Sequence, residues 1–283
     1  MEDHKSQGED GGPKTEIGAL SYYIYATEFI SAFGDRMWQF AIPILFLDVW
    51  ADSLLPTILY TFIINLATFL LMPICGSYVD TAPRLSLMML TIFGDNVAVF
   101  VSCGLLYCTT YVEDNDDLLW MMFYGILAVC VPGQLMVNVG TIALEKDWVP
   151  IMTEKEPHAL ATLSSRLRMI DLSCKFLGPT AFALFLQFLG GDSETRIRWG
   201  CGIVIGYNIL TVLPECVCVL LVYRATPRLA SAKCSSESAK KHASKNAFVE
   251  LFNGWNTYVK HPMFLASFSF TLLYATVLSP GSL

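Results

Sequence analysis

Long apolar stretches alternate with short polar ones along most of the chain. A helix that crosses a bilayer needs about 20 consecutive, mainly apolar residues, and each long stretch reaches roughly that length. Six of them cover residues 17–50, 54–79, 85–109, 118–144, 159–191 and 199–223. A further apolar stretch, 263–278, is followed by the helix-breaking sequence Ser-Pro-Gly-Ser-Leu. The pattern predicts an all-α integral membrane protein with six spanning helices and a partial seventh.

The first apolar stretch is too long for one straight span and carries unusual residues. Gly34, Asp35 and Arg36 interrupt it near the middle. Pro43, which lacks a backbone donor, lies near its end. We therefore expect a long or broken helix here. Between the fourth and fifth stretches, residues 145–158 are rich in charge and are expected to form a connection outside the membrane.

Polar segments divide the chain into four parts. These are a cytoplasmic N-terminal tail (1–16), a six-helix transmembrane lobe (17–223), a cytoplasmic linker (224–260) and a truncated seventh transmembrane helix (261–283). Within the linker, short side chains and charges are typical of a flexible segment. Six spans, a linker and a further span is the layout of a transporter built from two six-helix halves. A six-helix channel subunit is the alternative, but no selectivity-filter loop is evident.

Positively charged residues are unevenly distributed between the two sides of the predicted spans. The linker contains Arg224, Arg228, Lys233, Lys240, Lys241, Lys245 and Lys260. The opposite side offers only Arg196 and Arg198. Because loops rich in Lys and Arg stay in the cytoplasm, the N-terminus and the linker are predicted to be cytoplasmic. The expected location is the cell membrane.

Composition excludes several classes of protein. Of the 283 residues, 54% are hydrophobic and 15% are charged, against about a quarter charged in soluble domains. A soluble enzyme is therefore excluded, and the net charge of −7 offers no basic surface for nucleic acid. The sequence contains no Walker loop, dinucleotide-binding glycine pattern or nucleophile elbow. We expect no enzymatic activity and no prosthetic group.

Acidic residues inside the predicted spans are costly and need an explanation. Asp35, Asp95 and Glu215 lie in the first, third and sixth spans, and Asn208 precedes Glu215 by about two helical turns. Seven residues apart on a helix, the last two project from one face. We expect a shared polar cavity, although any one acid could instead be a buried structural group. Carboxylate and amide oxygens favour hard or borderline divalent cations, or protons.

Other charges suggest ion pairs or gates. Arg36 and its neighbour Asp35 either pair with each other or face different partners. Asp171 is preceded by Arg168 and followed by Lys175 at helical spacings, so the three form either a salt-bridge ladder on one helix or a gate. Gly76, Asp80 and Arg84 resemble the short loop signature of major facilitator transporters, in which an acid and a base bridge neighbouring helices. The alternative for this loop is an ordinary helix-capping turn.

Several of these residues together resemble the ferroportin family of iron exporters in the major facilitator superfamily. The similar segments are Gly34-Asp35-Arg36-Met37-Trp38, Asn96-Val97, Lys146-Asp147-Trp148, Ile170-Asp171, Asn208 with Glu215, Gly254-Trp255-x-x-Tyr258 and Phe264-Leu265-Ala266. The resemblance extends from about residue 17 to 278. It implies a major-facilitator-type N-terminal half plus a partial seventh helix.

The resemblance also implies ferrous-iron efflux by alternating access, with Co²⁺ as a related substrate. The family's metal-binding aspartate maps onto Asp35, and its histidine one turn later maps onto Gln39, a poorer ligand for Fe²⁺. A calcium site of the same half maps onto Asp35, Asp95, Asn208 and Glu215, with Asp95 where the family commonly has glutamine. Gating or salt-bridge roles are implied for Arg36, Asp80, Arg84, Asp147, Arg168 and Asp171.

The C-terminal end departs from the family pattern. The resemblance places a cysteine-bearing segment after the seventh helix, which forms a second metal site and contacts a peptide hormone; that segment is absent here, so hormone contact is not expected. The expected partners are membrane lipid, divalent metal ions, and either a full-length paralogue or a second copy of the chain. An alternative function follows: a truncated, non-transporting isoform that binds or inhibits a full-length exporter.

Overall fold

The computed structural model describes residues 14–112, 115–153, 157–230, 256 and 259–273. All regular elements in these ranges are helices. They are α1 (Lys14–Val49), α2 (Leu55–Thr81), α3 (Arg84–Thr109), α4 (Asp116–Ile142), the π-helical turn η1 (Ala143–Trp148), α5 (Val149–Met152), α6 (Pro157–Leu189), α7 (Ser193–Ala225), α8 (Pro227–Ala230) and α11 (Phe264–Leu273). The linker residues 231–255 and the last residues of the predicted seventh span, 274–278, lie outside the described ranges.

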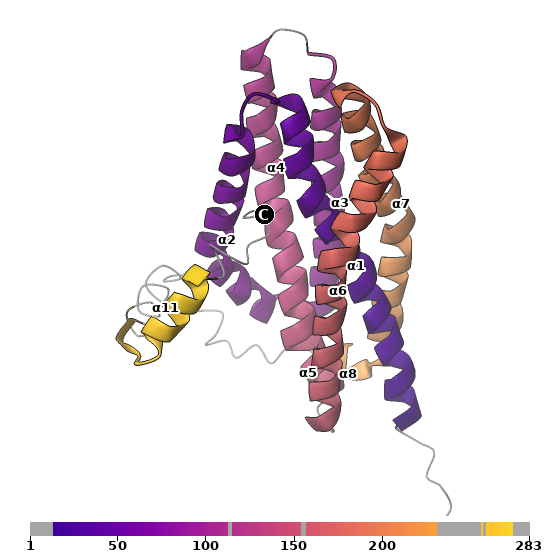
Figure 1. The fold of residues 1–283 in the computed structure, drawn as a ribbon. Coiled ribbons are helices and arrows are strands. Elements are labelled where there is room, and N and C mark those ends of the chain that lie inside the picture. The colour runs from indigo at the N-terminus through magenta and orange to yellow at the C-terminus, as the bar shows by residue number, and fades with distance from the viewer. Residues whose placement is uncertain (1–13, 113–114, 154–156, 231–255, 257–258, 274–283) are drawn as a thin grey trace, which may run out of the picture.

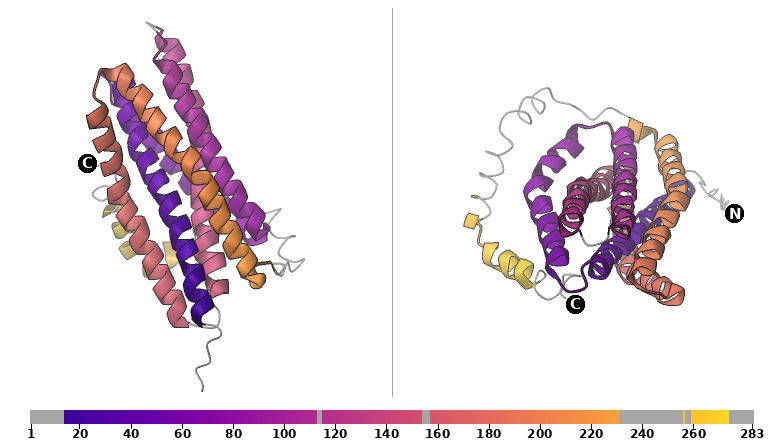
Figure 2. Two further views of the ribbon diagram at one scale, coloured as in Figure 1. Left: turned by 90° about the vertical axis from the view of Figure 1, so that its right-hand side faces the viewer. Right: turned by 90° about the horizontal axis from the view of Figure 1, so that it is seen from above.

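The long helices run side by side as one upright bundle (Figure 1). α1 packs against both α6 and α7, α3 packs against α4 and α7, and α2 packs against α4. In the view from above, α11 lies outside the bundle on the same side as α2 (Figure 2). Segments far apart in sequence are therefore brought together around α1 and α3.

The helices match the predicted apolar stretches closely. α1 is one continuous helix that includes Pro43, so the first stretch is long rather than broken. Five helical segments of the described chain are long and apolar enough to cross a membrane, and α1 is not among them. Glu28, Asp35 and Arg36 lower its hydropathy. α1 nevertheless runs along the bundle with the apolar helices, because α6 and α7 cover much of its surface.

The charged stretch after the fourth span is the clearest correction to the sequence prediction. Residues 143–152 continue α4 as η1 and α5 instead of forming a connection. Leu144, Trp148 and Val149 are buried, so three apolar side chains hold this stretch against the bundle. Lys146 is exposed between them. The prediction of a connection from local charge was therefore wrong for residues up to 152, because tertiary packing stabilises a helix there.

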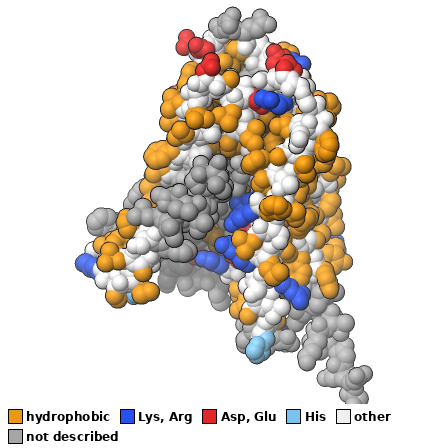
Figure 3. Space-filling model, in the orientation of Figure 1, with side chains coloured by type: hydrophobic (Ala, Val, Ile, Leu, Met, Phe, Trp, Pro, Cys, Tyr) orange, Lys and Arg blue, Asp and Glu red, His pale blue; other side chains and the backbone are white. Residues whose placement is uncertain are grey.

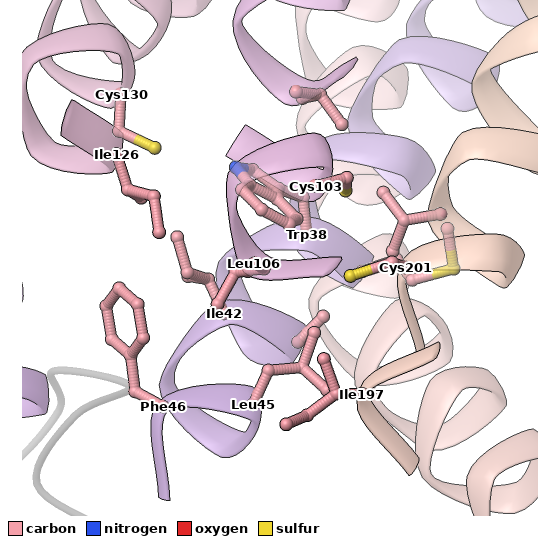
Figure 4. Packing of buried hydrophobic residues seen from close by; sticks show 14 of the residues in the cluster. Trp38, Ile42, Leu45, Phe46, Cys103, Leu106, Ile126, Cys130, Ile197 and Cys201 are labelled. Carbon is pink, nitrogen blue, oxygen red and sulfur yellow. The ribbon is translucent and has the colours of Figure 1, made fainter. Parts of the chain in front are cut away.

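Two hydrophobic clusters form the core, one toward each end of the bundle. The upper cluster is built around Trp38, Phe46, Leu106, Phe123 and Phe182, and Figure 4 shows how its side chains from α1, α3, α4 and α7 converge. The lower cluster contains Ile24, Val79, Ile92, Leu144, Trp148, Leu167 and Val219. Packing of these side chains in the two clusters holds the helices together.

Polar side chains lie between the two clusters on α1, α3, α6 and α7. We call this set the polar layer. Its members are Glu28, Ser31, Asp35, Arg36, Asp95, Asn96, Asp171, Lys175, Asn208 and Glu215. On α3, for example, Asp95 and Asn96 separate Ile92 of the lower cluster from Val99 of the upper one. The polar layer therefore lies between the two hydrophobic clusters along the bundle.

The helices approach closely where glycine faces a neighbour. A Cβ atom on Gly178 of α6 would lie 2.9 Å from the Met37 nitrogen of α1. A Cβ atom on Gly133 of α4 would lie 2.6 Å from the Ala98 Cβ of α3. Only glycine leaves room for these contacts, which are the kind of small-residue packing that lets membrane helices associate.

Candidate cation site

The polar layer lines two small cavities. The first, which we call the outer cavity, is lined by Asp35, Trp38, Gln39, Tyr60 and Asp95 together with residues of α4, and its volume is about 10 Å³. A space of this size is at the lower limit for a single water molecule. Asp35 and Gln39 lie one turn apart on α1, and Asp95 approaches from α3. The outer cavity thus contains two of the predicted acids.

The second cavity, which we call the inner cavity, lies closer to η1. Its volume is about 50 Å³. Among the residues that line it are Glu28, Ser31, Asp95, Asn96 and Glu215. Asp95 therefore borders both cavities, while Asp35 borders only the outer one and Glu215 only the inner one.

The predicted acids are thus brought into one layer but not into one tight cluster. Asn208 is buried, and its Nδ2 donates to the Val204 carbonyl oxygen at 2.9 Å; it lines neither cavity. Within the described ranges, no three His, Cys, Asp or Glu side chains are close enough to hold one metal ion. The calcium set expected from the resemblance, Asp35, Asp95, Asn208 and Glu215, therefore remains a prediction.

Arg36 controls the environment of Gln39. The Arg36 Nη1 donates to Gln39 Oε1 at 2.8 Å, so the amide oxygen predicted as a metal ligand already accepts a hydrogen bond from a cation. The Arg36 Nη2 donates to Asp171 Oδ1 of α6 at 2.6 Å. Arg36 therefore pairs across to α6 instead of with its neighbour Asp35. This outcome selects the second of the two alternatives that the sequence left open.

Asp171 is the centre of a charge network. Its Oδ2 lies 3.2 Å from Lys175 Nζ and 3.6 Å from Arg168 Nη1, as the helical spacing predicts. The side chain of Arg168 is 65% exposed, whereas that of Asp171 is 12% exposed. In the space-filling view, Lys and Arg side chains interrupt the apolar surface about halfway along the bundle (Figure 3). The ladder on α6 thus also joins α6 to α1.

A second ion pair joins α3 to η1 at the lower end of the bundle. Arg84 Nε of α3 donates to both carboxylate oxygens of Asp147 at 3.1 Å. Its Nη1 donates to the Leu229 carbonyl oxygen of α8 at 3.3 Å. Asp80, which the loop signature suggested as the acid, is exposed. The base of that signature therefore pairs with η1, and Asp147 is brought within reach by the helical continuation of α4.

Sequence reasoning missed several polar residues that the fold brings together. Glu28 precedes Asp35 by seven residues, the same two-turn spacing that related Asn208 to Glu215, so a signal was present. Asp48 of α1 pairs with Arg196 of α7 at the opposite end from Arg84. Its position near the end of the first apolar stretch gave no indication of this partner.

A helical bundle with long apolar helices and charged residues enclosed between them defines a multi-pass membrane protein with a transporter-type fold. Structural comparison agrees. A bacterial homologue of the iron transporter ferroportin in its outward-facing state matches 93% of this chain and 59% of its own, with a TM-score of 0.71 and 19% identity. The same homologue with soaked iron gives a TM-score of 0.68 over 93% of this chain and 58% of its own, also at 19% identity. The fold is therefore of the major facilitator type.

The sequence model of the Ferroportin1 (FPN1) family matches residues 18–283, and the chain belongs to this family. The mouse ferroportin is 24% identical over 96% of this chain and 55% of its own length. Human ferroportin is 25% identical over 98% and 56%. The rice solute carrier family 40 member 1 is 26% identical over 97% and 59%. The chain thus spans somewhat more than half the length of these relatives.

Proposed function

We propose that this chain forms the N-terminal half of a divalent-metal exporter that moves ferrous iron out of the cell by alternating access. One observation carries the proposal: Asp35 and Asp95 line a cavity within the helix bundle of a ferroportin family member. Acidic groups at membrane depth serve ion pathways when they face a cavity. The proposal includes a location in the plasma membrane, and the distribution of Lys and Arg supports a cytoplasmic N-terminus.

Asp35 is the proposed first ligand for the transported metal. Its carboxylate borders the outer cavity from α1, and Asp95 borders it from α3. Oxygen ligands accept Fe²⁺ and Co²⁺ but favour harder cations such as Ca²⁺. Gln39 contributes weakly because Arg36 occupies its oxygen. Glu215 and Asn208 complete the proposed Ca²⁺ set only after a rearrangement that brings them toward Asp35.

Two of the ion pairs between helices supply the proposed gate. Arg84 with Asp147 holds α3 against η1 at the lower end, and Arg36 with Asp171 holds α1 against α6 beside the cavities. Alternating access requires such contacts to break in one state and re-form in the other. Each pair is partly exposed, which lowers the free energy needed to separate it.

The test measures iron efflux from cells that express the 283-residue chain. Cells are loaded with radioactive iron, and release is followed for the parent chain, Asp35→Ala and Glu194→Gln. Glu194 is a matched acidic control because its side chain is exposed and, in the described part of α7, pairs with Arg198 four residues later. The proposal is supported if cells with the parent chain or Glu194→Gln release iron faster than cells without the chain, and cells with Asp35→Ala do not. Efflux that is as fast with Asp35→Ala as with the parent chain contradicts the assignment of Asp35.

A second arm tests the non-transporting alternative. Alternating access uses two halves that move around a shared site, and the chain spans somewhat more than half the length of the relatives it matches. The chain is co-expressed with mouse ferroportin over a range of doses. A dose-dependent fall in iron efflux supports an interacting or inhibitory role for the chain. Efflux that stays constant at every dose contradicts that role.

A further inference from the structure

We propose that the lower end of the bundle carries a binding site for a phospholipid whose headgroup bears a phosphate monoester. The site, which we call the lower corner, consists of Trp148, Tyr223, Arg224, Thr226 and Arg228, where η1, the end of α7 and α8 meet. It lies outside the polar layer, and none of its residues lines either cavity. The inference therefore does not depend on metal binding or on iron transport by the chain.

The first argument is that α8 is fixed against the bundle. The four residues Pro227–Ala230 follow α7 after a single residue and pack beside α5 (Figure 1). Leu229 is 2% exposed, and its carbonyl oxygen accepts a hydrogen bond from Arg84 Nη1 of α3 at 3.3 Å. These contacts hold the backbone around Arg228 at the end of α7, four residues after Arg224. Both arginine side chains are exposed there.

The second argument is that two buried polar atoms of the lower corner lack a partner. Trp148 is 1% exposed, and its indole Nε1, which can only donate, makes no hydrogen bond to any described residue. The buried Thr226 Oγ1 likewise has no partner in the described chain. The ring of Trp148 lies 6.2 Å from that of Tyr223, three residues before Thr226. Because buried donors without partners are rare, an occupant that accepts hydrogen bonds is expected here.

The third argument is charge. Both carboxylate oxygens of Asp147 on η1 accept from Arg84 Nε. Glu145, the other acid of η1, interacts electrostatically with Glu28 of α1. The acids of η1 are thus directed to α3 and α1, while the charged residues of the lower corner are both arginines. Exposed Lys146 adds positive charge to η1. At the upper end, by contrast, Asp and Glu side chains gather (Figure 3).

The surface above the lower corner favours a lipid over a soluble anion. Leu210, Leu213, Val217 and Leu221 of α7 are 76%, 71%, 52% and 40% exposed. Their spacing of three or four residues places them on one face of α7, and Arg224 continues that face after Leu221. An acyl chain that lies along this apolar face brings its headgroup to the level of Arg224. The distribution of Lys and Arg assigns this end to the cytoplasmic leaflet, which contains the anionic lipids.

The donors of the lower corner determine the headgroup. A guanidinium group binds phosphate through two parallel hydrogen bonds, and two such groups come from Arg224 and Arg228. A phosphate monoester carries roughly two negative charges and three acceptor oxygens. It can therefore accept from both arginines and still accept from the Thr226 hydroxyl and the Trp148 indole, directly or through an ordered water. A phosphodiester alone has less charge and fewer free oxygens for the same donors.

The experiment is native mass spectrometry of the purified 283-residue chain in detergent micelles, titrated with dioctanoyl phosphatidylinositol 4-phosphate. Dioctanoyl phosphatidylinositol, which lacks the monoester, and inorganic phosphate, which lacks the lipid, are titrated in parallel. The variants are the double substitution Arg224→Gln with Arg228→Gln, Thr226→Val and Trp148→Phe. Arg198→Gln is the matched control, because Arg198 is a 43% exposed arginine at the upper end of the same helix.

We expect the parent chain to bind the phosphorylated lipid about tenfold more tightly than either of the other two probes. The double substitution should weaken that binding about tenfold or more, and Thr226→Val and Trp148→Phe should each weaken it several-fold. Arg198→Gln should bind like the parent. Thermal unfolding without lipid checks that each variant is folded, and Thr226→Val tests the buried donors if Trp148→Phe is unstable.

Three outcomes would overturn the inference. They are absence of saturable binding of the phosphorylated lipid to the parent, equal affinity for phosphatidylinositol, and a loss in Arg198→Gln as large as in the double substitution. Inorganic phosphate that binds as tightly as the phosphorylated lipid would overturn the assignment to a lipid. Binding that depends on Arg224, Arg228 and Thr226 supports the lower corner whatever the result of the efflux assay.

Discussion

Arg36 of α1 donates to Asp171 of α6 across a distance of 2.6 Å, although Asp35 is its immediate neighbour in sequence. Adjacent residues of a helix point about 100° apart, so the two charges are directed to different places. Arg36 joins the network on α6, and Asp35 is left to border the outer cavity. Arg36 thus makes a structural contact between helices, and Asp35 stays available as a candidate ligand.

Removal of Asp171 is expected to destabilise the bundle strongly. Asp171→Asn leaves Arg36 and Lys175 without their carboxylate. Loss of one partner from a fully buried pair costs about 3 kcal/mol or more, and the partial exposure of Arg36 and Lys175 lowers the expected cost to about 2 kcal/mol. Arg168→Gln is the control, because Arg168 is 65% exposed at 3.6 Å from Asp171 and such a pair contributes less than about 1 kcal/mol. Thermal unfolding in detergent measures both. Equal effects of the two variants would contradict the central position of Asp171.

Removal of the Arg84 side chain is expected to loosen the lower end of the bundle. Arg84→Gln removes the charge facing Asp147 and weakens the hydrogen bond to the Leu229 carbonyl oxygen. Amide hydrogen exchange in residues 143–152 and 227–230 should then become several-fold faster, since exchange reports local opening. Asp80→Asn, at the exposed acid of the same loop, should leave those rates unchanged. If Asp80→Asn raised those exchange rates more than Arg84→Gln does, Asp80 would be the acid that acts at this end of the bundle, as the loop signature suggested.

A methyl group at Gly178 is expected to force α6 away from α1. The added Cβ would lie 2.9 Å from the Met37 nitrogen and 3.1 Å from the Arg36 Cβ, and backbone cannot move aside easily. Gly178→Ala should therefore lower the free energy of unfolding by about 1–3 kcal/mol. At Gly202 of α7 a Cβ meets nothing within 4 Å. Gly202→Ala should be neutral or stabilising, because alanine favours helix more than glycine does.

The pKa of Asp192, before the start of α7, is expected to lie below its usual value. The Thr195 hydroxyl donates to Asp192 Oδ1 at 2.6 Å, and this hydrogen bond stabilises the ionised carboxylate and lowers the pKa. A group whose pKa falls on folding adds stability above its unfolded pKa and loses that contribution as pH falls through the folded value. Thr195→Val should raise the pKa toward 3.8. NMR titration of the carboxyl carbon measures the change, and an unchanged pKa would exclude the hydroxyl as its cause.

Some side-chain contacts within a helix could be predicted from sequence. The spacing of Arg168, Asp171 and Lys175 predicted the ladder on α6, because residues three and four apart are neighbours on any helix. The same rule applied to Glu28 and Asp35 would have placed Glu28 on the face that borders the cavities. It could not have predicted that Asp95 borders both, because that depends on where α3 meets α1.

The sequence by itself determined where the apolar helices lie and that acids occur at membrane depth. The length of an apolar stretch and the spacing of residues along a helix are local properties, so both can be read from the sequence without knowledge of the fold. Only the tertiary structure decided that Arg36 pairs with Asp171, that Arg84 pairs with Asp147, and that η1 is helical. Each of these depends on the rotation and depth at which two packed helices meet. Those quantities are set by complementary side chains on both helices, such as Gly178 beside Met37, and not by either segment alone.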